Sequence, residues 1–308
     1  MKIINYILRV IISATFLFSA ITKLFPIEPF ELTLIDMGIS DWTFAPIMAR
    51  LLVGTELFLA VAVLFNLKYL GRYLTATLVV TGLFSFYLLL LLAFRGNDMN
   101  CGCFGDFIKM TPLESLLKNA VLAVIIVAAQ KTHESFKRHY LWVHFVVAAI
   151  AFTVPFVVNV VEFERREPDS NEYPYAFPTE YVPSHYFDSV DVSMEEGEYL
   201  IAFLSTTCSH CKVAAQKLGI AQRKYVLPEI KVFYLGSEKG VVKFEQESNA
   251  VFDYVLFNEA RVYKITSIFP TIFYVKNGQV HQQWNGADLS YNEMAKLSKM
   301  KKGIIRAH

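Results

Sequence analysis

Long apolar stretches dominate the first half of the chain and restrict its fold more than any other feature of the sequence. Each stretch has about 17 to 21 residues, enough for a helix rising 1.5 Å per residue to cross a hydrocarbon core of about 30 Å. The first is long for a signal peptide and lacks a small-x-small cleavage site, so we expect it to be retained. We therefore expect five membrane-spanning helices, at residues 4–24, 47–65, 74–94, 113–129 and 141–161.

The composition agrees with a partly membrane-embedded protein, because 54% of the 308 residues are hydrophobic and 19% are charged. A net charge of +1 gives no reason to expect a nucleic acid or an acidic substrate. A chain of this length allows about two domains. Its four cysteines are too few to hold such a fold together, so we interpret them as chemically active groups.

Charged residues in the loops predict the orientation in the membrane. Basic residues lie before or early in the first span, between the second and third, and between the fourth and fifth: Lys2, Arg9, Lys68, Arg72, Lys131, Lys137 and Arg138. The alternate loops carry acidic residues: Glu28, Glu31, Asp36, Asp41, Asp98 and Asp106. The positive-inside rule then places the N-terminus in the cytoplasm and the chain after the fifth span outside. Arg95, Arg165 and Arg166 oppose this trend without reversing it.

The second half contains a Cys-x-x-Cys motif, Cys208-Ser209-His210-Cys211, between an apolar run at 199–204 and a helical segment at 212–225. This spacing lets both sulfurs lie at the start of the helix, where the helix dipole and free N–H groups favour the thiolate that attacks disulfides. His210 is expected to stabilise the Cys208 thiolate, which makes the disulfide form oxidising. The motif predicts thiol–disulfide exchange.

The other two cysteines, Cys101 and Cys103, form a second close pair in a loop rich in turn formers. A disulfide in so small a ring is strained and easily reduced, and Gly102 allows the unusual dihedral angles it needs. The predicted topology places this loop on the same outer side as Cys208 and Cys211, so we predict a relay between the two pairs. Two alternatives stay open: structural or soft-metal-ligating cysteines in the loop, and a copper site shared by all four.

Two ionisable residues lie within the apolar stretches. Glu56 lies several residues into the second, where a carboxylate is costly and often functional. It is expected either to pair with Arg50 or Lys23, or to take part in the redox site, and the sequence leaves both open. His144, near the start of the fifth stretch, is expected to be interfacial and not a haem ligand.

Residues 162–186 are charged and contain several prolines, so we expect an extended tether there and no core segment. Residues 187–308 have the pattern of one small α/β domain. We expect strands at 199–204, 231–235, 272–275 and 279–284, helices at 212–225 and 290–301, and helical or irregular chain at 241–264. Asn277-Gly278 between two apolar runs predicts a tight hairpin.

This domain resembles the thioredoxin-like fold, in its periplasmic TlpA-like and DsbA-like branches. The resemblance rests on the segments 203–211, 269–271 and 277–278, which read Phe-Leu-Ser-Thr-Thr-Cys-Ser-His-Cys, Phe-Pro-Thr and Asn-Gly. It implies that Cys208 is the attacking thiol, that Cys211 resolves the mixed disulfide, and that Pro270 is a cis proline that shapes the substrate groove. The alternative for Pro270 is that it only marks the start of a strand.

The domain also departs from that pattern. Thr207 replaces the usual tryptophan before the first cysteine, and Ala202 stands where many thioredoxins have a buried acid that helps to deprotonate the resolving cysteine. The segment between Cys211 and Pro270 is longer than in thioredoxin, which implies an insertion. These departures concern proton handling and the choice of partner.

Residues 1–130 resemble the DoxX/MauE-like membrane family, at Phe18-Ser-Ala-Ile-Thr-Lys23 and at Cys101-Gly-Cys-Phe-Gly105. That family is similar in outline to the vitamin K epoxide reductase-like and DsbB-like four-helix bundles, which pass electrons between thiols and quinone. The resemblance implies a four-helix membrane domain at 1–130, followed by a fifth transmembrane helix within 131–161. A quinone is the cofactor that this analogy suggests.

The sequence thus predicts a membrane α-helical bundle of five transmembrane helices plus an α/β thioredoxin-like domain, in a bacterial inner membrane with the second domain periplasmic. The predicted activity is that of a thiol–disulfide oxidoreductase that exchanges electrons between periplasmic cysteine-containing proteins and the Cys101/Cys103 pair, in the direction of client oxidation. The alternatives are a non-catalytic assembly factor for one secreted client, and copper delivery. The sequence does not identify the client, the electron carrier or the oligomeric state.

Overall fold

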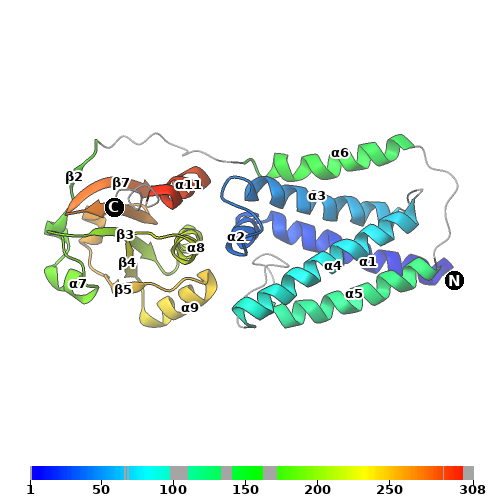
Figure 1. Cartoon of the computed structure of the whole chain (residues 1–308), viewed down its shortest axis with the longest axis horizontal. Coiled ribbons are helices and arrows are strands. Elements are labelled where there is room, and N and C mark those ends of the chain that lie inside the picture. Colours follow the sequence, from blue (N-terminus) through cyan, green and yellow to red (C-terminus); the bar gives the residue numbers. More distant parts are fainter. Residues whose placement is uncertain are drawn as a thin grey trace, which may run out of the picture. The chain divides into compact units, whose positions relative to one another are not determined.

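The computed structural model describes residues 2–65, 67, 69–97, 110–132, 141–161, 172–286 and 288–300. Contacts divide the chain into two compact units, Met1–Val161 and Glu162–His308 (Figure 1). Each unit has its own hydrophobic core.

The first unit is helical. It contains α1 (Lys2–Leu24), α2 (Glu28–Asp36), α3 (Ala45–Leu64), α4 (Leu70–Arg95), α5 (Pro112–Thr132) and α6 (Leu141–Val158). Among the described residues, four of these helices, α1, α3, α4 and α5, are long and apolar enough to cross a membrane. In this bundle α1 packs against α3 and α5, and α4 packs against α5 (Figure 1). The predicted class, a membrane-type helical bundle, is confirmed.

The prediction of five spans is wrong by one. The apolar part of α6 is Trp142–Val158, which is shorter than the four long helices and rises about 26 Å. The helix contains Pro155, which lacks a backbone donor, and it ends at Val158 instead of continuing to Val161. It packs along α3 (Figure 1), where Gly54 allows close approach: a Cβ at Gly54 would lie 2.7 Å from Cδ1 of Phe152.

The bundle has apolar side chains on its outer surface as well as in its core. Ile12, Leu74 and Ile126 are fully buried between the helices. Leu117 and Phe145, in contrast, are 68% and 75% exposed. A soluble protein rarely exposes so much apolar surface, whereas a lipid bilayer requires it, so this surface fits the membrane location that the helix lengths indicate.

The second unit is a six-stranded mixed sheet with helices on both faces. The strands are β2 (Tyr175–Ala176), β3 (Glu198–Ser205), β4 (Glu229–Leu235), β5 (Asp253–Leu256), β6 (Thr271–Lys276) and β7 (Gln279–Asn285), in the order β2-β7-β6-β3-β4-β5. The neighbours β3, β4 and β5 are parallel, and β6, β7 and β2 pair antiparallel. The helical segments are η1 (Thr179–Tyr181), α7 (Ser184–Ser189), α8 (Ser209–Lys224), α9 (Glu238–Ser248), α10 (Val262–Ile265) and α11 (Tyr291–Met300).

This arrangement confirms the predicted α/β thioredoxin-like class, because β3 leads into the Cys-x-x-Cys helix α8 and lies centrally between parallel β4 and antiparallel β6. The predicted hairpin is also confirmed. Lys276 pairs with Gln279, and the two residues between them, Asn277 and Gly278, both have positive φ, of 49° and 71°. Strand β5 was not predicted. It is a four-residue edge strand within a segment expected to be helical or irregular, and pairing with β4 defines it.

The predicted tether, 162–186, is only partly described, since residues 162–171 lie outside the described residues. From residue 172 onward, the prediction that this segment contributes nothing to a hydrophobic core is wrong. Strand β2 pairs with β7 and forms the edge of the sheet, and Phe177 and Val182 are buried with Phe187 in the core. The prolines do not prevent this, because an edge strand needs hydrogen bonds on one side only.

Candidate functional site

Cys208 lies between the end of β3 and the start of α8, where it is the N-cap residue of the helix. Its backbone is extended, with φ −89° and ψ 123°, and its sulfur accepts a hydrogen bond from the Cys211 amide at 3.4 Å. The side chain is half-buried. The sulfur therefore lies at the free N–H groups and the positive end of the helix dipole, and its partial exposure leaves it accessible to a partner molecule.

Cys211, in contrast, is fully buried on the first turn of α8. Its sulfur accepts a hydrogen bond from the Ser205 amide at the end of β3, at 3.3 Å. Burial raises the pKa of the Cys211 thiol well above its ordinary value, and the Ser205 N–H partly opposes this shift. Both cysteines are free thiols in the structure. The pair is therefore asymmetric, with one accessible sulfur and one shielded sulfur.

Pro270 lies beside this pair. The Phe269–Pro270 peptide bond is cis, and the Cys208 sulfur lies 3.7 Å from the Phe269 carbonyl oxygen. Pro270 itself is buried at the head of β6. The fold thus brings a segment distant in sequence next to the Cys208 sulfur, as the resemblance implied, and the role of Pro270 in binding substrate stays a prediction.

The residues around the cysteines differ in exposure. His210 is in the first turn of α8 and its side chain is exposed. Thr207 is also exposed, and its hydroxyl lies 3.2 Å from the Ser205 hydroxyl. The predicted influence of His210 on the Cys208 thiolate is not decided by this position and stays a prediction.

A polar group that the sequence did not indicate lies on the neighbouring strand. Ala202 of β3 is buried, and its side chain provides no acid. Leu204 lies two residues further along β3 on the same face of the sheet, and it pairs with Tyr234 of β4. The Tyr234 hydroxyl is buried and has no hydrogen-bond partner among the described residues. Burial raises the pKa of Tyr234, and charges at Glu245, Tyr254 and Cys211 raise it further. No local pattern identifies this residue, because its position depends on the register of two strands.

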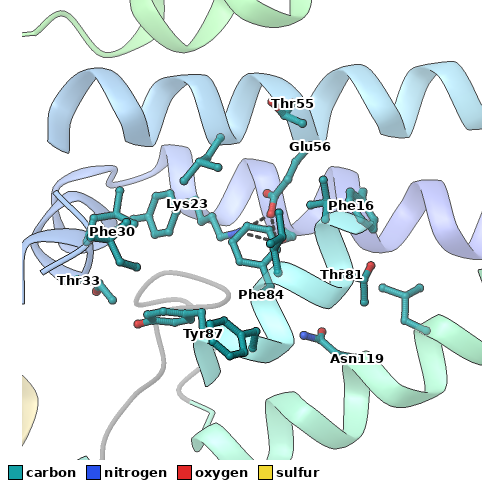
Figure 2. Close-up of a pocket in the computed structure, with 18 of the residues that line it drawn as sticks. Phe16, Lys23, Phe30, Thr33, Thr55, Glu56, Thr81, Phe84, Tyr87 and Asn119 are labelled. Carbon is teal, nitrogen blue, oxygen red and sulfur yellow. Dashed lines mark hydrogen bonds and ion pairs between the residues drawn. The ribbon is translucent and has the colours of Figure 1, made fainter. Parts of the chain in front are cut away.

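The helical unit contains a second candidate site, a cavity of about 380 Å³ lined by α1, α2, α3, α4 and α5 (Figure 2). Its lining is mainly apolar and aromatic, with Lys23 and Glu56 at one place in the wall. Lys23 Nζ lies 2.5 Å from Glu56 Oε1, and both side chains are 4% exposed. Lys23 also donates to the Ser19 hydroxyl at 3.0 Å, and its Nζ lies 4.6 Å from the centre of the Phe84 ring.

The expected pairing of Glu56 is thereby resolved in favour of Lys23. Arg50, the other partner considered, binds Glu31 of α2 at 2.5 Å. The second oxygen of Glu56, Oε2, is buried and makes no hydrogen bond within the described part of the chain. His144 of α6 packs against the Tyr73 ring, with 6.0 Å between ring centres. A part for Glu56 in redox chemistry stays a prediction.

Cys101 and Cys103 lie outside the described residues, so the relay between the two cysteine pairs stays a prediction. Within the described ranges, no group of three or more His, Cys, Asp or Glu side chains is arranged to hold a metal ion.

Comparisons with known proteins agree with this division of the chain. Residues 1–132 match the family model of methylamine utilisation protein MauE. The chain is 25% identical over 338 aligned positions to protein TlpB of Flavobacterium psychrophilum, with 91% of each chain covered. A solved structure, of a candidate thiol:disulfide interchange protein DsbE from Chlorobium tepidum, has 19% identity and a TM-score of 0.29, and covers 48% of this chain and 98% of that chain. The match to the MauE model covers the helical unit up to the end of α5, and the thioredoxin-like class of the second unit rests on its own sheet order and its Cys-x-x-Cys helix.

Proposed function

We propose that this protein is a membrane-bound thiol–disulfide oxidoreductase. The observation that carries the proposal is the asymmetric pair at the start of α8, in which Cys208 is accessible and Cys211 is shielded. Exchange chemistry needs this difference, because one sulfur must meet the partner protein and the other must act only after a mixed disulfide has formed. Attachment to a MauE-like helical domain supports a membrane location.

In the direction we favour, the Cys208–Cys211 disulfide oxidises a client protein. A client thiolate attacks the Cys208 sulfur, which forms a mixed disulfide and releases Cys211 as a thiolate that takes up a proton. A second client thiolate then attacks the client sulfur of the mixed disulfide, so that the client gains a disulfide and Cys208 leaves. The Ser205 N–H, 3.3 Å from the Cys211 sulfur, would stabilise the thiolate that forms in the first step.

The reduced pair must then be reoxidised. We propose that Cys208 and Cys211 pass two electrons and two protons to a disulfide between Cys101 and Cys103, and that a quinone accepts them from there. The loop charges support a cytoplasmic N-terminus, with the thioredoxin-like domain in the periplasm of a bacterial inner membrane. The clients would be periplasmic proteins with cysteines.

The first test traps the relay in the full-length protein. In the Cys211→Ser variant a mixed disulfide on Cys208 cannot be resolved, so mass spectrometry should find Cys208 linked to Cys101 or Cys103. A Cys208 linked only to other proteins would contradict the internal relay. A control variant, Cys208→Ser, should form neither link.

A second measurement tests turnover itself. Purified protein supplied with a dithiol peptide and an oxidant should convert many equivalents of peptide. Conversion of a single equivalent would favour the assembly-factor alternative. Stoichiometric copper binding that is lost when both Cys208 and Cys211 are serine would favour copper delivery.

A further inference from the structure

Three buried side-chain oxygens in the described part of the second unit make no hydrogen bond. They belong to Gln216 of α8, Tyr234 of β4 and Glu245 of α9. Buried polar atoms are nearly always hydrogen-bonded, so such exceptions need an explanation. The three elements meet, because α8 packs against α9, and the Phe244 ring of α9 lies 5.4 Å from the Tyr234 ring. An amide does not titrate, which leaves Tyr234 and Glu245 as the two groups able to move protons.

Cys211 lies at the same part of the sheet. Tyr234 of β4 pairs with Leu204 of β3. The next residue of β3, Ser205, donates its N–H to the Cys211 sulfur at 3.3 Å. Burial raises the pKa of Tyr234, and the charges of Glu245 and Cys211 raise it further. The Tyr234 hydroxyl is therefore within electrostatic reach of both the carboxylate and the sulfur.

Packing fixes the ring that carries this hydroxyl. The rings of Phe244 and Tyr254 contact the Tyr234 ring at interplanar angles of 70° and 69°, and Tyr234 is fully buried. A phenylalanine would fill the same space and leave no polar atom without a partner. The hydroxyl gains a partner when a thiolate forms nearby, because a charged sulfur accepts a stronger hydrogen bond than a neutral thiol. Its presence thus fits a role during turnover.

Glu245 connects this buried position with solvent. Its side chain is half-buried: Oε1 is shielded and without a hydrogen bond in the described chain, while the Phe252 N–H donates to the carboxylate. Burial raises the pKa of Glu245, and the Phe252 N–H partly opposes this shift. A carboxyl group shifted toward neutral pH both gives and takes protons readily near pH 7.

The charged groups on the elements packed around Glu245 have other partners. Lys212 of α8 binds Glu247 at 2.5 Å. The Tyr254 hydroxyl of β5 donates to Glu238 at 2.8 Å. Glu245 itself forms no ion pair within the described residues, so burial and not a neighbouring cation governs its protonation.

We propose that Tyr234 and Glu245 form the path by which Cys211 exchanges its proton with solvent. They take the part of the acid that Ala202 does not provide. The proposal rests on the proposed function, in which the Cys208–Cys211 bond breaks and its electron pair goes to the Cys211 sulfur. The Tyr234 hydroxyl gives its proton to this sulfur and takes one from the Glu245 carboxyl group, which recovers a proton from water. In the reverse exchange, the same groups remove the proton from Cys211.

The test follows this reverse exchange in the full-length protein. Cys101 and Cys103 are replaced by serine, so that only the second pair reacts. A nitrobenzoate disulfide, whose released thiolate absorbs visible light, reacts first with Cys208 and leaves a mixed disulfide. Cys211 must then lose its proton to attack this mixed disulfide and release a second equivalent. Stopped-flow absorbance separates the two phases, and the second phase reports the proton path.

Tyr234→Phe and Glu245→Gln should each slow the second phase at least about tenfold at neutral pH and leave the first phase unchanged. The slowing should shrink as the pH rises, because hydroxide then removes the proton. Glu245→Asp, which keeps a carboxyl group, should restore part of the rate. The double variant should be no slower than the slower single variant, because both groups serve one path. Additive slowing would overturn the proposal.

Two matched controls remove similar groups nearby. Tyr254→Phe removes a hydroxyl that is bonded to Glu238, and Glu247→Gln removes a carboxylate from the same helix as Glu245. Both should keep the wild-type rates. His210, exposed on the first turn of α8, is present in every variant, so its contribution cancels in the comparison. Equal slowing in the controls, or slowing of both phases together, would contradict a specific path.

The two phases also distinguish failure of the path from failure of the proposed function. A wild-type protein that shows both phases, with the second insensitive to Tyr234→Phe and Glu245→Gln, would keep the exchange function and refute the path. A wild-type protein that forms the mixed disulfide but never releases the second equivalent would refute the proposed function, because Cys211 would then not resolve it.

Discussion

Cys208 caps the helix that carries Cys211: its sulfur accepts a hydrogen bond from the Cys211 amide at 3.4 Å. The two sulfurs are three residues apart, yet one is accessible and the other is fully buried. This difference arises because the N-cap lies outside the helix, whereas Cys211 on the first turn faces the end of β3. It predicts that the two thiols differ in their reactivity.

In the reduced protein we expect iodoacetamide to modify Cys208 at least ten times faster than Cys211 at neutral pH. Cys208 is accessible at the helix terminus, whereas Cys211 is shielded and its pKa is raised by burial. Peptide mapping by mass spectrometry after timed labelling measures both rates. Unfolding in urea should abolish the difference, and equal rates in the folded protein would contradict the assignment of roles.

The raised pKa of Cys211 also predicts a pH dependence of stability. The folded protein keeps this thiol protonated, while the unfolded chain ionises it above about pH 8.5. The contribution to stability is therefore complete below about pH 8.5 and is lost as the pH rises above it, by up to about 1.4 kcal/mol per pH unit. Proteolysis of the second unit in increasing urea, at about pH 8 and pH 9.5, measures this loss in the reduced protein. Cys211→Ser should remove most of the difference, and an unchanged slope would contradict the prediction.

His210→Ala should make the reduction potential of the Cys208/Cys211 pair more negative. Without the imidazole, the Cys208 thiolate and hence the reduced form are less favoured. Equilibration with glutathione buffers, followed by gel-shift of the alkylated protein, gives the potential. Ser209→Ala, at the adjacent exposed position, is the control. An unchanged or less negative potential in His210→Ala would exclude this role.

Tyr234→Phe should stabilise the second unit by about 1 kcal/mol. The Tyr234 hydroxyl is buried without a partner in the described chain, and an unsatisfied buried hydroxyl costs about 1–3 kcal/mol. The urea midpoint for proteolysis of the second unit reports the change in the free energy of unfolding. A loss of stability instead would mean that the hydroxyl is hydrogen-bonded in the folded protein.

Gly54→Ala should destabilise the helical unit by about 1–3 kcal/mol, because its Cβ would lie 2.7 Å from the Phe152 ring and 3.2 Å from the Ala151 carbonyl oxygen. Thermal unfolding in detergent measures the effect. Gly82→Ala is the matched control, since a Cβ there meets nothing within 4 Å and alanine favours a helix. A Gly54→Ala variant as stable as Gly82→Ala would show that α6 does not need this close packing against α3.

Local patterns predicted much of this fold. Four of the five apolar stretches are helices long enough to span a membrane, and the Asn277-Gly278 hairpin lies where the turn residues indicated. Two of the wrong predictions have the same kind of cause. The edge strand β5 and the docked segment around Phe177 depend on pairing with β4 and β7, and neither partner is near in sequence.

The sequence alone determined that the chain has a membrane-type helical unit, a small α/β unit and a cysteine at the start of α8, because helix length, period and turn chemistry act between residues close in the chain. Only the tertiary structure decided that Glu56 pairs with Lys23 and that Arg50 pairs with Glu31. The sequence contains both acids and both bases and does not say which acid pairs with which base. A buried charge pairs with the partner that the packing of the helices brings within hydrogen-bonding distance.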